Sequence, residues 1–298
     1  MNAGDTAGND SGNSSGKTSP ENVPQCGPKN CMTRLKLTVA YVGTAYAGWQ
    51  IQSAGQGAST IQQELERALE RIAGFPVRVH GAGRTDSGVH AEGQTAHADV
   101  PDKPVDWLRA LNAALPRDIR VLAVEAVSPE FHARYNATGK LYAYSLFCGH
   151  GPVPPRLAPF VWAVPSLDIA DTASAEAMCA AAEILVGRHD FASFQNAGTP
   201  VADTVREIWS IHREDGHAGP FLCPPEWPVR TWYFYGNGFL KQMVRNLVGV
   251  LVQVGRGKAC PRDVAVWLAA GDRRAVPSPT APAAGLTLMR VEYGPRGQ

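Results

Sequence analysis

The stretch Gly81-Ala82-Gly83-Arg84-Thr85-Asp86-Ser87-Gly88-Val89-His90-Ala91 is the segment around which the rest of the chain is organised. It is a glycine-bounded loop with a guanidinium, a hydroxyl and a carboxylate at consecutive positions, and its glycines let the backbone come close to a ligand. Residues 76–80 before it and 94–100 after it have the alternation of short strands. The sequence therefore predicts that Asp86 lies at a strand-loop-strand junction.

Two common glycine-loop sites do not fit this stretch. A dinucleotide-binding fingerprint requires a third glycine where the chain has Asp86. A phosphate-binding P-loop requires lysine and then serine or threonine where the chain has Val89-His90. A plain turn, in which Arg84 and Asp86 pair with each other, stays open at this point.

A metal site is a further alternative for the same region. His80, Asp86, His90 and His97 are normal ligand types. They have no cysteine partner and none of the usual short zinc spacings, so we predict no metal.

The composition is that of a globular protein, with 44% hydrophobic residues in a chain of 298. No apolar run reaches the roughly 18 residues of a membrane span, and residues 1–31 lack the pattern of a secretory signal. We therefore expect a cytoplasmic protein with no membrane association. Residues 1–31 are rich in Gly, Ser, Asn and Pro, which predicts a disordered tail. The six cysteines show no framework spacing and are expected to be reduced thiols.

The pattern of expected elements predicts an α+β fold. Strand, helix, strand, strand, helix, strand from 32 to 127 is the order of a ferredoxin-like (RRM-like) unit, and the second half is a weaker echo of it. We expect two such halves, 32–150 and 151–298, with antiparallel sheets joined into one larger sheet and a cleft between them. The loop 215–228 is long, and no regular element is expected there.

Charge and aromatic patterns bear on the ligand. The net charge of +1 argues mildly against a polynucleotide partner unless basic residues gather locally. If the two sheets join, such residues could line a cleft around Asp86: Arg78, Arg84, Arg117, Arg120, Arg134, Lys140, Arg188, Arg206, Lys241 and Arg245. Arg245 lies on an otherwise apolar helix predicted over 239–254, so it needs a carboxylate or phosphate partner. The aromatic loop 41–52 could cap a core or stack on a base, and Tyr142 could face either core or cleft.

The residues closely resemble the TruA-type tRNA pseudouridine synthase family. The similarity runs in the family's order from about residue 32 to 294 and rests on the following segments: Gly83-Arg84-Thr85-Asp86-Ser87-Gly88-Val89-His90-Ala91, Gly43-Thr44, Gly48-Trp49-Gln50, Leu111-Asn112, Leu115-Pro116, Phe131-His132-Ala133-Arg134, His189-Asp190-Phe191, Ser193-Phe194, Met243-Val244-Arg245-Asn246, Gly249, Ala281-Pro282-Ala283 and Gly285-Leu286.

The resemblance implies a function and a site. The family isomerises uridine to pseudouridine in the tRNA anticodon stem-loop, at positions 38–40, without metal or organic cofactor and usually as a homodimer. By resemblance, Asp86 is the essential carboxylate, acting as nucleophile or base. Arg84 would pair with Asp86 and help to expel the target nucleotide, and Tyr142 would stack on the everted base. Arg245 would keep the carboxylate charged, and Leu286 would pack against the base.

Two departures and two alternatives accompany this interpretation. Val42 stands where the family often has an acid, and Ser59 where it often has arginine, so one expected phosphate contact is in doubt. A non-catalytic RNA-binding protein would explain the element order and the aromatics but gives Asp86 no task. A metal-dependent hydrolase is the third alternative.

Overall fold

The structure is a computed structural model of the chain, and it describes residues 32–51, 58–196, 203–219 and 221–295. The predicted tail, residues 1–31, lies outside the described residues, as do Cys26 and Cys31. The other four cysteines are free thiols, as predicted: Cys148, Cys179, Cys223 and Cys260.

The alternating apolar segments form strands and the longer amphipathic segments form helices. The strands are β1 (Met32–Tyr41), β2 (His80–Gly81), β3 (His90–Pro101), β4 (Ile119–Val127), β5 (Ala137–Cys148), β6 (Trp162–Val164), β7 (Gly187–Asp190), β8 (Val205–Asp215), β9 (His217–Ala218), β10 (Phe221–Leu222), β11 (Val229–Gly236) and β12 (Leu286–Tyr293). The helices are α1 (Ile61–Ala73), α2 (Trp107–Ala114), α3 (Thr172–Leu185), α4 (Met243–Gly255) and α5 (Pro261–Ala269). Short 3-10 turns are η1 (Gly43–Ala45), η2 (Ala158–Phe160), η3 (Ala192–Phe194) and η4 (Arg273–Ala275).

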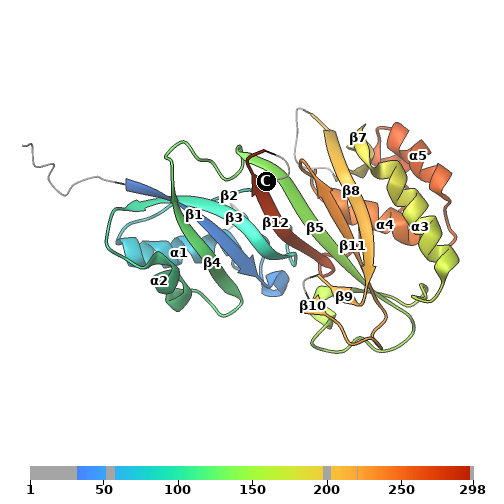
Figure 1. Cartoon of the computed structure of the whole chain (residues 1–298), viewed down its shortest axis with the longest axis horizontal. Coiled ribbons are helices and arrows are strands. Elements are labelled where there is room, and N and C mark those ends of the chain that lie inside the picture. The colour runs from blue at the N-terminus through green and yellow to red at the C-terminus, as the bar shows by residue number, and fades with distance from the viewer. Residues whose placement is uncertain (1–31, 52–57, 197–202, 220, 296–298) are drawn as a thin grey trace, which may run out of the picture. The chain divides into compact units, whose positions relative to one another are not determined.

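A ten-stranded sheet is the centre of the fold (Figure 1). Its strands run in the order β4-β1-β3-β12-β5-β11-β8-β7, with β2 paired to β3 and β6 paired to β5. The pairs are antiparallel except β3 with β12 and β5 with β6. The predicted α+β class with a large, mostly antiparallel sheet is therefore confirmed.

The contact between β3 and β12 joins the first strands of the chain to the later ones. It is short, because only Thr287 with His90 and Leu288 with Ala91 are paired. His90 begins β3 directly after the Asp86 loop, so the catalytic candidate lies next to this junction. Beyond it, β12 continues along β5.

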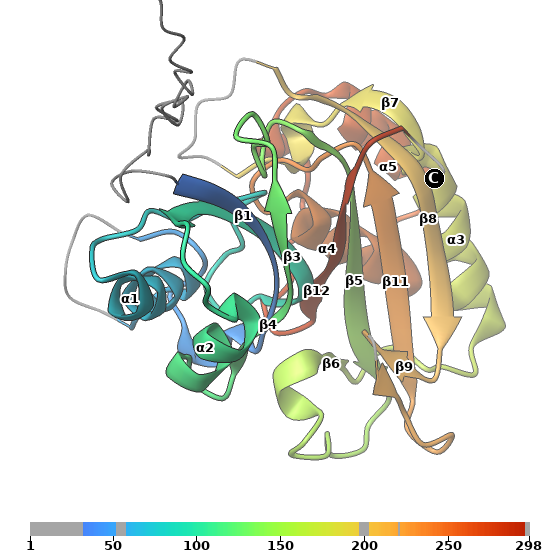
Figure 2. The same ribbon diagram turned by 60° about the vertical axis from the view of Figure 1, so that its left-hand side comes forward.

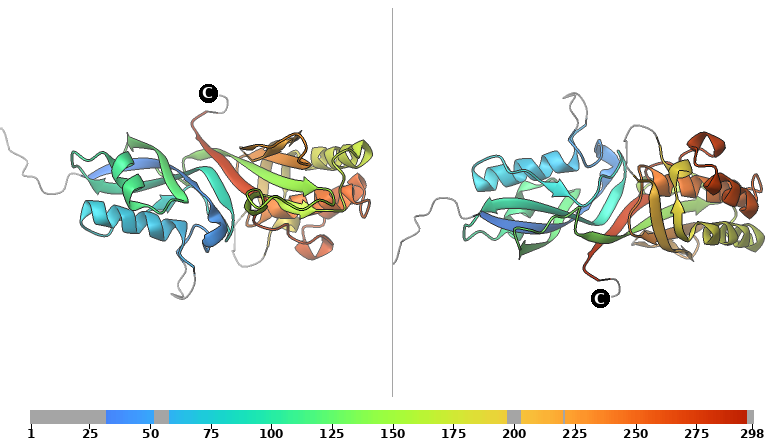
Figure 3. Two further views of the ribbon diagram at one scale, coloured as in Figure 1. Left: turned by 90° about the horizontal axis from the view of Figure 1, so that it is seen from below. Right: turned by 90° about the horizontal axis from the view of Figure 1, so that it is seen from above.

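The helices form two groups along the sheet. Figure 2 shows α1 and α2 beside β1, β3 and β4, whereas α3, α4 and α5 lie beside β5, β11 and β8. The two views of Figure 3 show the same grouping from above and below. The apolar faces of both helix groups belong to one continuous buried core.

Local sequence signals explain the helix ends. Thr60 caps α1, because its side chain accepts a hydrogen bond from Gln63 N, and Gly74 ends the helix in the left-handed region with φ of 88°. Asp106 and Asp171 cap α2 and α3 in the same way. The predicted helix near 173–186 is confirmed as α3.

Four expectations are wrong in detail, for identifiable reasons. The expected strand over 76–80 is reduced to β2, because Val79 N donates to Glu66 Oε1 on α1 (3.0 Å) rather than to a strand. The helix expected from 239 begins at Met243, because Gln242 has φ of 59°, outside the right-handed helical region. The apolar stripe of residues 107–115 predicts Leu108 in the core, but this side chain is exposed on α2. The loop 215–228 contains a short antiparallel ladder of β9 and β10.

No helix in the described part of the chain combines the length and the apolar character that crossing a membrane requires.

Replacement of Leu37 by alanine tests the position of the core. Leu37 on β1 is fully buried, so we expect the free energy of unfolding to fall by about 2–5 kcal/mol as a cavity forms. Leu122 on the neighbouring strand β4 is 54% exposed, and Leu122→Ala should change the free energy of unfolding by less than about 0.5 kcal/mol. Urea unfolding followed by circular dichroism measures both. Equal losses in the two variants would contradict this burial pattern.

Candidate active site

The loop that carries Asp86 is fixed by the end of β1 and the segment after it. The Tyr41 and Thr85 hydroxyl oxygens lie 2.8 Å apart, and Trp49 N donates to Thr85 O (3.1 Å). Gly48 has φ of +89°, and a Cβ there would lie 2.6 Å from Thr85 O. Close backbone approach at Gly48 therefore holds residue 85 in place, and with it the neighbouring carboxylate.

Two of the aromatic side chains between residues 41 and 52 are part of this support. Trp49 is fully buried, and a Cβ at Gly81 would lie 2.5 Å from its indole ring. Tyr41 is buried beside it, with ring centroids 6.2 Å apart. Of the two roles left open for these aromatics, the structure gives Tyr41 and Trp49 the core role.

An ion pair between Asp86 and Arg245 joins the loop before β3 to helix α4. Arg245 Nη1 lies 3.0 Å from Asp86 Oδ2, and Arg245 Nε donates to Ala281 O (2.7 Å). The side chains are 13% exposed for Arg245 and 28% exposed for Asp86. The prediction that a guanidinium on this apolar helix needs an anionic partner is confirmed, and the partner is Asp86.

A buried amide network holds the carbonyl that orients Arg245. Asn246, the next residue on α4, donates to Phe194 O (2.7 Å) and accepts from the Thr280 hydroxyl (2.7 Å). Thr280 directly precedes Ala281 in the chain. Because Asn246 is almost fully buried, these hydrogen bonds fix the 280–281 segment against α4.

Tyr142 and Leu286 are brought to the same place from adjacent strands. Tyr142 on β5 is buried and meets Phe239 edge-on, with ring centroids 5.3 Å apart. Burial raises the pKa of the Tyr142 phenol, and the electrostatic effects of Tyr41 and Asp86 raise it further. Leu286 is buried at the start of β12, the neighbour of β5.

Arg84 does not take the predicted position. It is exposed and forms no salt bridge in the described part of the chain, so the expected pairing of Arg84 with Asp86 is wrong. The loop turns the intervening Thr85 inward to Tyr41, which leaves Arg84 at the surface. Asp86 pairs instead with a residue 159 positions away, Arg245.

Lys140 and Gln94 also contact the loop, and sequence reasoning gave them no specific role there. Lys140 Nζ donates to Ala82 O (3.0 Å), and Gln94 Nε2 donates to Gly83 O (2.8 Å). A Cβ at Gly83 would lie 2.6 Å from Lys140 Nζ, so the end of the lysine side chain would have to shift if this residue were not glycine. The signal was present in the alternation of Lys140 with Tyr142, which puts both side chains on one face of β5.

The four histidine and aspartate residues considered as metal ligands are used otherwise. His90 Nδ1 accepts from Gly43 N (3.1 Å), and its Nε2 lies 2.8 Å from Pro159 O. His97 Nδ1 accepts from Ala133 N (3.1 Å). Among the residues that the structure describes, no group of three or more His, Cys, Asp or Glu side chains is placed to hold a metal ion.

The two departures from the family pattern lie on the N-terminal side of the site. Val42 is exposed, and its N–H donates to Asp118 O (2.9 Å). The Ser59 hydroxyl is engaged by Glu64 of α1 (2.5 Å), so it acts in the local structure at the start of this helix.

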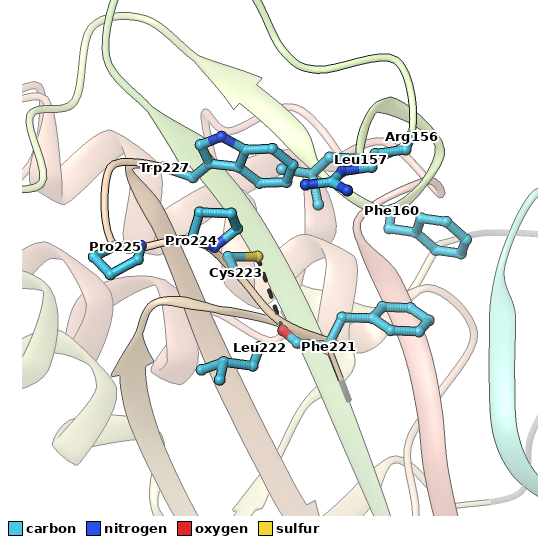
Figure 4. A pocket seen from close by; sticks show the side chains of 9 residues that line it. All are labelled: Arg156, Leu157, Phe160, Phe221, Leu222, Cys223, Pro224, Pro225 and Trp227. Atoms are coloured by element: carbon cyan, nitrogen blue, oxygen red, sulfur yellow. Dashed lines mark hydrogen bonds between the residues drawn. The ribbon is translucent and has the colours of Figure 1, made fainter.

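A separate apolar pocket lies beside the β9–β10 ladder (Figure 4). It has a volume of about 500 Å³, and Arg156, Phe160, Phe221 and Trp227 are among the residues that line it. The guanidinium of Arg156 lies over the Trp227 ring, 4.6 Å from its centroid. None of the predicted site residues lines this pocket.

The arrangement around Asp86 defines what the site can do chemically. A carboxylate held by one guanidinium can act as a nucleophile or a general base. Tyr142 and Leu286, both buried, lie on the adjacent strands β5 and β12. The site therefore suits acid-base or nucleophilic chemistry by a partly buried carboxylate.

Known proteins similar to this chain share one description. The sequence model of a family described as tRNA pseudouridine synthase matches residues 37–136 and 181–294. A protein of Solidesulfovibrio magneticus named tRNA pseudouridine synthase A is 55% identical over 268 residues, which cover 89% of this chain and 93% of the relative. A protein of the same name from Nitratidesulfovibrio vulgaris (strain Miyazaki F) is 52% identical over 286 residues, covering 88% of this chain and 100% of the relative. A chain in the crystal structure of a Cbf5-Nop10-Gar1 complex covers 85% of this chain, and 48% of its own length, at 10% identity. Its TM-score of 0.34 is too low to bear on the fold.

The Lys140 ammonium predicts a pH dependence of stability. Burial, and to a smaller extent nearby arginines, lower the pKa of Lys140 from 10.5 to about 8. Between these two values the unfolded chain binds more protons than the folded chain, so stability should rise with pH across this window. We expect the free energy of unfolding of the wild type to rise from pH 8 to pH 10.5 relative to that of Lys140→Met, as measured by urea unfolding. A difference that stays constant with pH would show that Lys140 titrates as in the unfolded chain.

Proposed function

Because this chain belongs to the tRNA pseudouridine synthase family, we propose that it isomerises uridine to pseudouridine in tRNA, with Asp86 as the essential carboxylate. The observation that carries the residue assignment is the Asp86–Arg245 ion pair, with 3.0 Å between Arg245 Nη1 and Asp86 Oδ2. It provides a partly buried carboxylate, paired with a guanidinium, where the chemistry requires one.

The reaction itself sets the requirements. Pseudouridine is the carbon-linked isomer of uridine, so a carbon–nitrogen glycosidic bond breaks, the detached uracil rotates, and a carbon–carbon bond to the ribose forms. A proton leaves the ring carbon that becomes attached, and the freed ring nitrogen gains one. No water, electron or group is consumed, and a carboxylate and a proton donor suffice.

Each residue near Asp86 has a role in this proposal. Asp86 attacks or deprotonates the uridine as the glycosidic bond breaks. Arg245 would keep the carboxylate charged in a site with little water. Tyr142 and Leu286 would hold the everted base, and the Phe239 edge fixes the angle of the Tyr142 ring.

The resemblance allows Tyr142 to stack on the base or to remove the final proton, and its raised pKa favours stacking. A phenol whose pKa is raised by burial stays protonated at neutral pH. Tyr142 would therefore stack on the base and donate a hydrogen bond, and the removal of the ring-carbon proton falls more readily to Asp86.

Arg84 retains a place in the proposal with a different partner. Its exposed guanidinium forms no salt bridge with the described residues, so it is available to RNA. It would fill the space that the target nucleotide leaves in the helical stack, or bind a neighbouring phosphate.

The substrate position and the assembly follow from the resemblance. We expect the target uridines at positions 38–40 of the anticodon stem-loop, a homodimer in solution, and a cytoplasmic enzyme that needs no cofactor. Light scattering on the purified chain measures the oligomeric state directly.

The interpretation as two ferredoxin-like halves is supported by the strand order. In the first half, β4-β1-β3-β2 is the order 4-1-3-2 of such a unit, and β12-β5-β11-β8 repeats it for the later strands. This grouping puts β5 in the second half, so we place the boundary before Ala137 rather than after residue 150. We propose that the cleft lies between these two groups of strands, near the short β3–β12 contact.

The two alternative functions considered from the sequence have less support than the synthase. Family membership favours an enzyme over a non-catalytic RNA-binding protein, which leaves the Asp86–Arg245 pair without a task. No observation in the described residues favours a metal-dependent hydrolase.

Asp86→Asn tests the catalytic assignment. The substitution removes the charge but little volume, so it should abolish pseudouridine formation in a tRNA transcript and change tRNA affinity by less than about threefold. Carbodiimide-dependent reverse-transcription stops map the product, and filter binding measures the affinity. Asp102→Asn, at an exposed position, is the control and should keep full activity. Turnover by Asp86→Asn would refute the assignment.

Arg245→Leu tests the ion pair. Removing the guanidinium leaves Asp86 without its partner in a site of low exposure, so kcat/KM should fall by about 100-fold or more. Arg256→Leu, at the other end of α4, removes a hydrogen bond to Ser166 and should keep kcat/KM within about threefold. Single-turnover kinetics on one tRNA transcript compare the two. An unchanged rate in Arg245→Leu would mean that the pair is dispensable.

A further inference from the structure

We propose that Lys140, Arg134 and Arg206 form a seat for one backbone phosphate of the RNA, next to the target nucleotide. This proposal rests on the function proposed above and adds a binding site that the resemblance does not assign. Three cations from three different segments are gathered at the edge of the catalytic loop: the start of β8, the start of β5 and the segment before β5.

Lys140 is the centre of this group. Its ammonium donates to Ala82 O (3.0 Å) and lies so close to Gly83 that a Cβ there would be 2.6 Å away. A lysine ammonium has three protons to donate. In the described part of the chain this one makes a single hydrogen bond and no salt bridge. Two donors therefore remain for a ligand, beside the backbone that leads to Asp86.

The sheet register places Arg206 on the same face as Lys140, two strands away. Lys140 on β5 pairs with Gly236 on β11, and Gly236 pairs with Ile208 on β8. Residues paired directly across strands share a face, and Arg206 lies two residues from Ile208, on the same face. Two strand spacings amount to roughly 10 Å between backbones, a distance that the long side chains can span.

The Arg206 side chain lies near Gly238, the residue before Phe239. Its Cδ lies 3.9 Å from the position of a Cβ at Gly238, whose neighbour Phe239 meets the Tyr142 ring. The Arg206 guanidinium donates to the carbonyls of Asp203 (3.1 Å) and Val205 (2.6 Å), which hold its Nη1 in place. A phosphate bound there would belong to the nucleotide that Tyr142 stacks on, or to its direct neighbour.

Arg134 approaches from the segment before β5. The segment is tied down, because Ala133 N donates to His97 Nδ1 and Arg134 N donates to His132 Nδ1, both at 3.1 Å. The guanidinium lies over the exposed Tyr135 ring, 5.8 Å from its centroid. The charges of Arg134 and Arg206 both help to lower the pKa of Lys140, so each lies within electrostatic reach of this ammonium.

This group lacks the anion that such a group needs. None of Arg134, Lys140 and Arg206 forms a salt bridge with a carboxylate among the residues that the structure describes. Clustered positive charges repel one another, and a bound anion relieves this repulsion. Phosphate fits best, since arginine donors match its oxygens and lysine adds a point charge. The alternative is that Lys140 has a structural role only, through its hydrogen bond to the Ala82 carbonyl.

A double-mutant cycle, with one change in the RNA and one in the protein, tests whether Lys140 binds a phosphate or only holds the Ala82 carbonyl. A stem-loop oligoribonucleotide with one target uridine is prepared with single methylphosphonate linkages, each of which removes one phosphate charge. With the wild type, one linkage near the target should weaken binding by about five- to tenfold. The same linkage should have no effect on Lys140→Met, because the charge that it meets is already gone.

Salt dependence gives the second readout. The magnitude of the slope of log K against log[salt] should fall by about 1 in Lys140→Met, Arg134→Gln and Arg206→Gln. In the two arginine variants, KM should rise about tenfold with kcat nearly unchanged. Arg109→Gln, on the exposed face of α2, is the control and should leave both the slope and the linkage map unchanged.

Two results would overturn the proposal. One is a linkage effect of equal size in Lys140→Met and the wild type; the other is an unchanged salt slope in Arg134→Gln and Arg206→Gln. If Lys140→Met does not fold, the two arginine variants carry the test, and Lys140→Arg should restore the linkage effect. The outcome is separable from the proposed function, because binding is measured: a wild type that makes no pseudouridine but shows the linkage pattern refutes the synthase and keeps the phosphate seat.

Discussion

The ion pair between Asp86 and Arg245 is the interaction on which the rest of the site depends. It links a loop before β3 to the first turn of α4, two segments 159 residues apart in sequence. Removing an isolated carboxylate or an isolated guanidinium from water costs free energy, which pairing the two charges offsets. Each group therefore lowers the free-energy cost of burying the other, and the fold must keep the two side chains in contact.

The fold achieves this register through layers of contacts that do not touch a ligand. On one side, Tyr41 and Trp49 fix the backbone at Thr85, directly before the carboxylate. On the other, the Asn246 network fixes the segment whose carbonyl grips the Arg245 guanidinium. The short β3–β12 pairing connects the two supports. Some of the residues that resemble the family, among them Trp49 and Asn246, are thus structural supports for one charged pair.

The sequence predicts much of this arrangement where the local signal is strong. Alternation predicts β1, the Thr60 cap predicts the start of α1, and a guanidinium on an apolar helix predicts a partner for Arg245. It fails where the outcome depends on backbone dihedral angles or on distant contacts. The left-handed conformation of Gln242 shortens α4, which frees Phe239 to pack on Tyr142 instead of continuing the helix.

The same limit explains the errors at the site. Sequence proximity suggested that Arg84 is the partner of Asp86, but the inward turn of Thr85 exposes Arg84. Lys140 was visible only as one basic residue among many, because its contact with Ala82 depends on how the two groups of strands meet. Pairings between distant segments of this kind are set by tertiary structure, which periodicity and local propensity do not encode.

The central claim is that Asp86 faces an everted uridine held between Tyr142 and Leu286. A crystal structure of the Asp86→Asn variant with a stem-loop RNA tests this most directly. The account predicts a target uridine outside the helical stack, its ring against Tyr142 and Leu286, and the residue 86 side chain in contact with the ribose or the uracil ring. A uridine that remains stacked in the RNA while the protein is bound, or one that lies away from residue 86, would contradict it.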